Sequence, residues 1–215
     1  MDYGTLYTVL MLTQGISAFV VGPERRVLIT LDLDLYSRAL KIQQSVGNKL
    51  WLLLPGVLHI GFTCLHTLGK TIDGSGIDTC AIESGTYTSE ALRGIYGGKA
   101  YKRGVEYHIT TSLAIMMMRF DAISAALPPG PLRVQCSALK KALHERSPDM
   151  VEIYNNLQSS YSENVKPLED EKVIGELTHF LMQYLEQVES LLHLIGACRS
   201  GDWEGYLAAL ENVIK

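Results

Sequence analysis

The feature that most constrains the fold is an alternation of short apolar runs and helical segments between residues 27 and 68. Val27–Leu31 and Leu50–Leu54 are short apolar runs with the composition of buried strands. Each is followed by a segment of helical composition, Leu35–Val46 and Val57–Leu68. Strand, helix, strand and helix with short joints are typical of a parallel sheet covered by helices. The sequence therefore predicts a small parallel βαβ sheet with two clear strands.

The rest of the chain reads as helix, and the expected fold class is α/β to mainly α with an all-helical C-terminal half. After Gly74-Ser75-Gly76 no further strand is predicted, and helices are expected at 86–96, 99–127, 132–145, 148–160, 168–198 and 201–214. The run Pro128-Pro129-Gly130-Pro131 is the best candidate boundary. It divides an α/β core with a long helix (1–127) from a helical C-terminal region (132–215), which either stands alone or packs with the core as one domain.

The apolar segment Leu6–Val21 is predicted to be a buried helix. It contains polar residues such as Gln14, is preceded by Asp2 and stops at Gly22-Pro23, which argues against a signal peptide and a membrane span. We therefore expect no membrane partner. The four cysteines include no CxxC pair, and we interpret them as reduced thiols of an intracellular protein, in the nucleus or the cytoplasm. The net charge of −4 excludes a polycation that coats nucleic acid along its whole length.

Asp32, Asp34 and His59 are the candidate catalytic residues. Asp32 and Asp34 follow the first predicted strand, where parallel sheets gather ligands, and residues two apart on a strand share a face. The two carboxylates are therefore a candidate Mg²⁺ or Mn²⁺ site for a residual nuclease. His59 follows the second strand and would lie nearby. The alternative interpretation is that one of the carboxylates caps the helix that begins near Leu35.

The segment RGIYGGKAYKR, residues 93–103, is the candidate nucleic-acid-binding element. It contains Arg93, Lys99, Lys102 and Arg103, two tyrosines and no acid. Cations interleaved with aromatic side chains suit a phosphate backbone with stacked bases, so DNA is a candidate partner. The alternative is a basic surface turn between two helices.

A heptad-spaced apolar stripe is the clearest periodic feature of the C-terminal region. Its members are Ile174, Leu177, Leu181, Tyr184, Val188, Leu191 and Ile195. Such a stripe is suited to pairing with a second copy or with another helical protein. The additional apolar residues Leu185 and Leu192 widen it, which is more typical of a helix packed on its own domain.

Three stretches together resemble a family of transposon-derived proteins found in animal genomes, with more distant relatives in fungi. They are ITLDLDLYSRALKI (29–42), LPGVLHIGFTCLHTLGKTIDGSGID (54–78) and LIGACRSGDWEGYLAAL (194–210). The resemblance covers nearly the whole chain in the right order. It implies descent from a transposase-type nuclease of RNase H-like character, in which acids hold two divalent metal ions.

Residue by residue, the resemblance matches Asp32 to the acid after the family's first strand and His59 to the histidine after its second. Some distant relatives carry an acid two residues before that histidine, where this chain has Val57. We therefore expect a catalytically incomplete domain that retains some nucleic-acid binding. The alternatives are a residual metal-dependent nuclease and a helical protein-interaction module.

Overall fold

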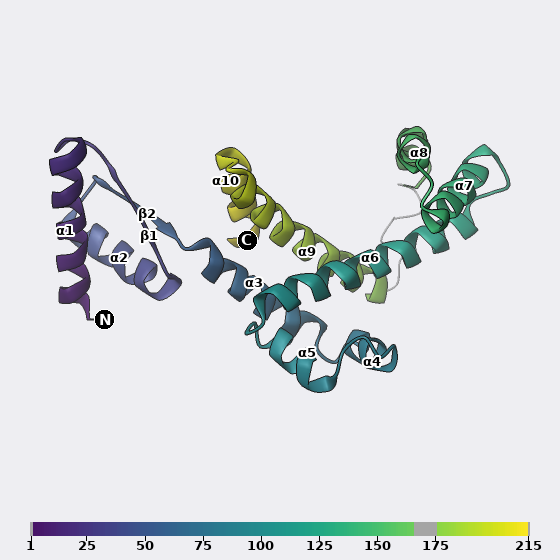
Figure 1. The fold of residues 1–215 in the computed structure, drawn as a ribbon, viewed down its shortest axis with the longest axis horizontal. Coiled ribbons are helices and arrows are strands. Elements are labelled where there is room, and N and C mark those ends of the chain that lie inside the picture. Colours follow the sequence, from purple (N-terminus) through teal and green to yellow (C-terminus); the bar gives the residue numbers. More distant parts are fainter. Residues whose placement is uncertain (1, 166–175, 215) are drawn as a thin grey trace.

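The structure is a computed structural model that describes residues 2–165 and 176–214. Those residues form ten helices and two strands (Figure 1). The helices are α1 (Tyr3–Val21), α2 (Leu33–Val46), α3 (Val57–Ile72), α4 (Ile77–Glu83), α5 (Ser89–Tyr96), α6 (Tyr101–Ala126), α7 (Pro131–Glu145), α8 (Met150–Val165), α9 (Glu176–Ser200) and α10 (Trp203–Ile214), and the strands are β1 (Val27–Leu31) and β2 (Trp51–Pro55). The predicted fold class is confirmed. Helix α4 was not predicted, because the Gly-Ser-Gly break before it reads as a long loop.

The two strands pair in parallel, with Val27 opposite Trp51, as the βαβ pattern predicts. Alternate side chains of the strands point to opposite faces of the sheet. One face packs on α1 and α2 through buried residues that include Ile29 and Leu53. On the other face Leu28 and Leu52 lie opposite each other and are exposed. Within the described chain, helices therefore cover the sheet on one side.

Helices α3, α5, α6 and α9 enclose the main core. Its buried members include Leu65, Ile95, Tyr107 and Leu191, one from each helix. Helices α3 and α5 approach closely at Gly69, where an added Cβ would lie 2.5 Å from the Tyr96 Cα. Helices α3 and α5 can therefore pack this closely only because residue 69 is a glycine, without a Cβ. Helix α10 then packs back on α9 and on α3.

The proline-rich joint separates α7 and α8 from the main core. These two helices form a small cluster of their own at the far end of α6, built on Leu127, Cys136, Leu139 and Leu157. Helix α9 returns to the main core and joins α3 and α6 there. Helices α7 and α8 and helix α9 therefore belong to different clusters in the described structure. The first part of the helix expected at 168–198 lies outside the described residues.

The molecule is extended, and it exposes more surface than a compact chain of its size. Figure 1 shows the βαβ unit, the main core and the α7–α8 pair strung along one direction. The accessible surface is 14155 Å². A compact monomer of 23.8 kDa would expose about 9,900 Å². Much of the excess is apolar, since α1 and α6 both expose many large apolar side chains.

Helices α1 and α6 are also long and apolar enough to cross a membrane, judged by length and composition. Core helices of soluble proteins pass the same test, but such helices are mostly buried. In α1 only 11% of the apolar window is buried, and in α6 only 6%. The prediction of a buried helix at Leu6–Val21 is therefore wrong. The reason is that α1 packs on a unit of only two strands and α2, which is too small to surround it.

Candidate nucleic-acid interface

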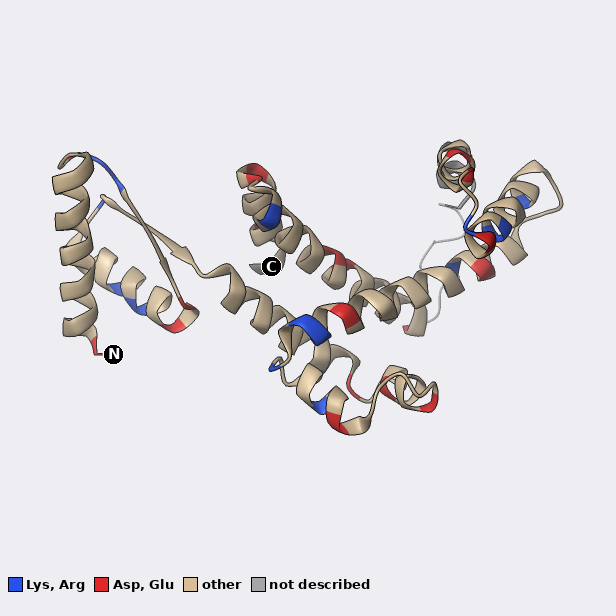
Figure 2. Cartoon of the chain, viewed as in Figure 1, with Lys and Arg blue, Asp and Glu red and all other residues tan. Residues whose placement is uncertain are grey.

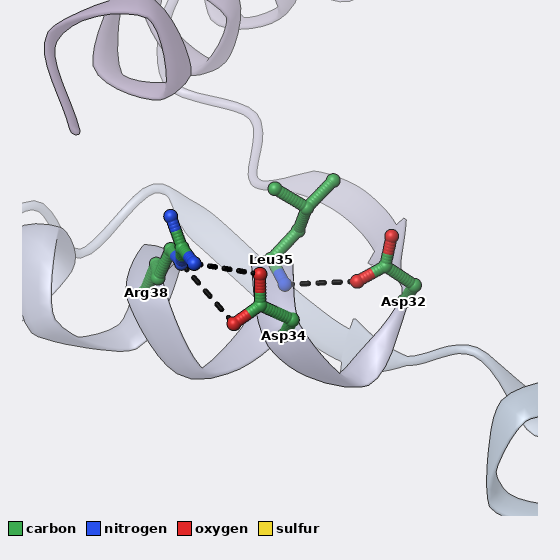
Figure 3. Close-up of polar contacts among 4 residues, drawn as sticks. All are labelled: Asp32, Asp34, Leu35 and Arg38. Atoms are coloured by element: carbon green, nitrogen blue, oxygen red, sulfur yellow. Dashed lines mark hydrogen bonds and ion pairs between the residues drawn. The ribbon is translucent and has the colours of Figure 1, made fainter. Parts of the chain in front are cut away.

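Asp32 and Asp34 are both engaged in local contacts of α2 (Figure 3). Strand β1 ends at Leu31, and Asp32 is the N-cap of α2, its carboxylate accepting a hydrogen bond of 2.9 Å from the Leu35 N–H. Asp34 lies inside the first turn of the helix and forms an ion pair with Arg38, with a nitrogen–oxygen distance of 2.9 Å. The two carboxylates therefore do not share a strand face, and the capping interpretation describes Asp32.

His59 lies in the first turn of α3 and is exposed. Throughout residues 2–165 and 176–214, no three His, Cys, Asp or Glu side chains come close enough to hold a metal ion. His66, also on α3, donates a hydrogen bond of 3.0 Å from its Nδ1–H to the Tyr96 carbonyl oxygen and helps to join α3 to α5. The described residues thus contain no cluster of three such side chains for the Mg²⁺ or Mn²⁺ ions of the nuclease hypothesis.

The four predicted DNA-binding cations lie together at the joint between α5 and α6 (Figure 2). Arg93 is in the last turn of α5, Lys99 is in the connecting turn, and Lys102 and Arg103 are in the first turn of α6. All four are exposed, and none forms an ion pair or a side-chain hydrogen bond with any residue in the described ranges. We call this set the α5–α6 cation cluster.

The joint that carries the cluster is held against α3 by a glycine. Gly98 adopts a φ of +68°, and an added Cβ would lie 3.0 Å from the Phe62 carbonyl oxygen and 3.1 Å from the His66 Cβ. A side chain at this position would be strained both by the backbone conformation and by the contact with α3. The cations therefore project from a turn that is seated on the main core.

The N-terminus of α6 carries positive charge where helices usually avoid it. Its N-cap is Ala100, which has no side chain to accept the free N–H groups, and no acid lies in the first turn. Lys102 and Arg103 occupy that turn instead. Basic residues next to the positive end of the helix dipole are unfavourable, whereas a bound anion is favoured there. The missing cap is a signal that the sequence contains, in the run Gly-Gly-Lys-Ala before Tyr101.

The two tyrosines of the segment are used inside the protein. The Tyr96 hydroxyl lies 2.9 Å from the Tyr107 hydroxyl, and burial raises the pKa of Tyr96 well above its ordinary value. The Tyr101 ring packs edge-on against Phe62, with ring centres 5.3 Å apart, and lies over Gly61. Neither ring is presented as a platform for base stacking. The cluster therefore offers charge and backbone N–H groups for phosphate oxygens.

The apolar stripe of α9 is divided between buried and exposed residues. Tyr184, Val188, Leu191 and Ile195 are buried in the main core against α3, α5 and α6. Leu181 is half-buried, and Leu177 is exposed. Ile174 lies outside the described residues. The buried part of the stripe has no free surface for a second chain, because its own core already covers it.

A buried histidine joins α6 to α9 inside the main core. His108 Nδ1 lies 2.8 Å from the Tyr184 hydroxyl, and its Nε2 has no hydrogen-bond partner within the described part of the chain. Burial lowers the pKa of His108 from 6.5 to about 4. No local pattern singles out this residue, since its partner is 76 positions away in the chain.

These features define a mainly helical chain with a small parallel sheet and a cluster of exposed, unpaired cations at the α5–α6 joint. The chain belongs to the family described as domain of unknown function (DUF8702), whose model matches residues 1–215. No curated protein and no solved structure matches the chain.

Proposed function

We propose that this chain is a transposon-derived, catalytically incomplete domain that binds nucleic acid through the phosphate backbone. The observation that carries the proposal is the α5–α6 cation cluster, four exposed cations without an ion-pair partner in the described structure. The three motifs that resemble the transposon-derived family support the same origin. The capping and ion-pair roles of Asp32 and Asp34 support a domain without a nuclease centre.

The proposed contact is with phosphate oxygens and has no sequence preference of its own. Exposed Lys and Arg side chains on a rigid turn neutralise phosphates, and the uncapped N-terminus of α6 adds N–H donors and a favourable dipole. Because the neighbouring tyrosine rings are occupied, stacking on bases adds nothing at this site. Double-stranded DNA should therefore bind at least as well as a single strand.

The test is fluorescence anisotropy with labelled double- and single-stranded DNA of mixed sequence at 50 and 200 mM salt. The logarithm of the binding constant falls linearly with the logarithm of the salt concentration, with a slope of about −0.9 for each phosphate contacted. If all four cations contact phosphates, the affinity for duplex should therefore fall about 100-fold between these salt concentrations. Replacing Arg93, Lys99, Lys102 and Arg103 by Glu should abolish binding at 50 mM salt.

A matched control is available in the βαβ unit. Arg25, Arg26, Lys41 and Lys49 are two arginines and two lysines, all exposed, so their replacement by Glu changes the net charge by the same amount. This control should retain binding. Equal losses in both quadruple variants would show that only the overall charge matters, and no binding by the unaltered chain at 50 mM salt would refute the proposal.

A further inference from the structure

Helix α1 turns an uncharged, apolar face to solvent. Its 19 residues include no Lys, Arg, His, Asp or Glu. Leu6 and Leu10 are buried against the βαβ unit, and Gln14 accepts a hydrogen bond of 2.8 Å from Asn48 on the same side. The opposite side carries Leu12, Ile16 and Phe19, which are 61%, 67% and 93% exposed. The same side carries the small residues Gly4, Thr8 and Gly15. We call the set Gly4, Thr8, Met11, Leu12, Gly15, Ile16 and Phe19 the outward face of α1.

The small residues of this face leave room for another helix. A Cβ added at Gly15 would meet no atom within 4 Å, and one added at Gly4 would meet only the Asp2 carboxylate. Large side chains stand at one end of the face, where Phe19 is almost fully exposed, and glycine stands at the other. The face therefore combines the projecting Phe19 ring at one end with a shallow site at Gly4 at the other. At the α-helical rise per residue, the two lie about 22 Å apart along the helix.

We propose that the outward face of α1 pairs with the same face of a second copy of this chain, with the two helices antiparallel. A two-fold axis between Met11 and Leu12 places Phe19 of each copy over Gly4 of the other. The same axis places Thr8 opposite Gly15, so two small residues meet where the backbones come closest. A face whose two halves complement each other in size is what a two-fold interface requires, because each copy uses the same residues.

The charges at the ends of α1 favour the same orientation. Antiparallel helices place the negative end of one dipole beside the positive end of the other. Asp2, which caps the N-terminus through the Thr5 N–H, then lies beside the turn that follows α1 in the second copy. That turn carries Arg25 and Arg26 against one acid, Glu24. A parallel pair would bring the two Asp2 carboxylates together instead.

The surface suits a second copy better than it suits a bilayer. Interfacial helices carry Lys and Arg on the polar side, and α1 has none. Crossing a bilayer would require α1 to leave the βαβ unit, separating Leu6 and Leu10 from their core and breaking the bond between Gln14 and Asn48. A pair of helices about 28 Å long buries on the order of 1,000 Å² in total, near the lower bound for a specific interface. We therefore expect a dimer with a micromolar dissociation constant.

The test is sedimentation equilibrium of the full chain over a range of about 5 to 200 μM, without nucleic acid, so that the outcome does not depend on the proposed function. The unaltered chain should show a monomer–dimer equilibrium. The variant I16E/F19E should weaken dimerisation at least 100-fold while its helical circular dichroism stays unchanged. The matched control M117E/M118E replaces two apolar residues of α6 that are 65% and 71% exposed, and it should dimerise like the unaltered chain.

Cysteine cross-linking tests the orientation independently of any loss of folding. In a background with the exposed Cys80 and Cys198 replaced by Ser, a mixture of T8C and G15C chains should form a disulfide-linked heterodimer. Neither variant alone should cross-link, because equivalent positions would lie about 10 Å apart along the axis, beyond disulfide reach.

A strictly monomeric chain at 200 μM, or a dimer that survives I16E/F19E, would overturn the proposal. So would cross-linking of T8C alone, which indicates parallel helices. Flotation of a monomeric chain with phosphatidylcholine vesicles, lost in I16E/F19E, would assign the face to a bilayer and would also overturn it.

Discussion

Lowering the pH from 7.5 to 5 should destabilise the main core through His108. The side chain is buried, and burial holds its pKa at about 4, whereas the unfolded value is near 6.5. Between these two pKa values the unfolded chain binds a proton that the folded chain excludes. The stability that comes from keeping His108 neutral is therefore fully present above pH 6.5 and is lost progressively as the pH falls toward 4.

The magnitude follows from the two pKa values. At pH 5 the linkage relation gives a loss of about 2 kcal/mol relative to pH 7.5, a roughly 30-fold increase in the unfolding equilibrium constant. That loss is a large fraction of the 5–15 kcal/mol that is usual for a folded domain. It should appear in guanidinium titrations, followed by circular dichroism, as a lower midpoint at pH 5.

Replacing His108 by Gln isolates this contribution, because the amide can still bond to the Tyr184 hydroxyl but does not titrate in this range. The variant should lose about 2 kcal/mol less than the unaltered chain between pH 7.5 and 5. Replacing the exposed His59 by Gln is the matched control and should leave the pH dependence unchanged. Equal pH dependence in the H108Q variant and the unaltered chain would refute the argument, since the proton would then bind elsewhere.

Five further substitutions, at four positions, test the described contacts by chemical denaturation. Asp32→Ala should lower the free energy of unfolding by about 1 kcal/mol through loss of the α2 cap, while Asp32→Asn should lower it little. Mg²⁺ should not stabilise the unaltered chain, and a clear stabilisation that either variant removes would revive the metal hypothesis. Gly69→Ala should destabilise by about 1–3 kcal/mol despite its better helix propensity, because its Cβ would overlap the Tyr96 backbone. Leu191→Ala should lower the free energy of unfolding by about 2–5 kcal/mol, because Leu191 is buried, and Leu177→Ala should hardly change it, because Leu177 is exposed. Similar losses for the two variants would contradict the division of the α9 stripe into a buried and an exposed part.

Much of the fold follows from local sequence. Strands β1 and β2, the helix between them and the end of α6 at the proline-rich joint lie where the apolar runs and the Gly and Pro residues predict them. These features are set by interactions over a few residues. The cap of α2 belongs to the same class, because Asp32 and the Leu35 N–H are three positions apart. The positions of the four cations at a turn were predictable for the same reason.

What each element packs against was decided by the tertiary structure. The sequence pattern does not show that the Tyr96 and Tyr101 rings turn inward, because their partners Tyr107 and Phe62 belong to other helices. Nor does it distinguish the buried half of the α9 stripe from Leu177, since both halves share one period.

Helix α1 shows the same division most clearly. Its apolar composition fixes a helix but not how much of that helix is covered, and the small βαβ unit beside it covers only one side. Periodicity is a property of neighbours along the chain, whereas burial depends on how much of the remaining chain reaches each face, so only the tertiary structure reveals the apolar side that remains open.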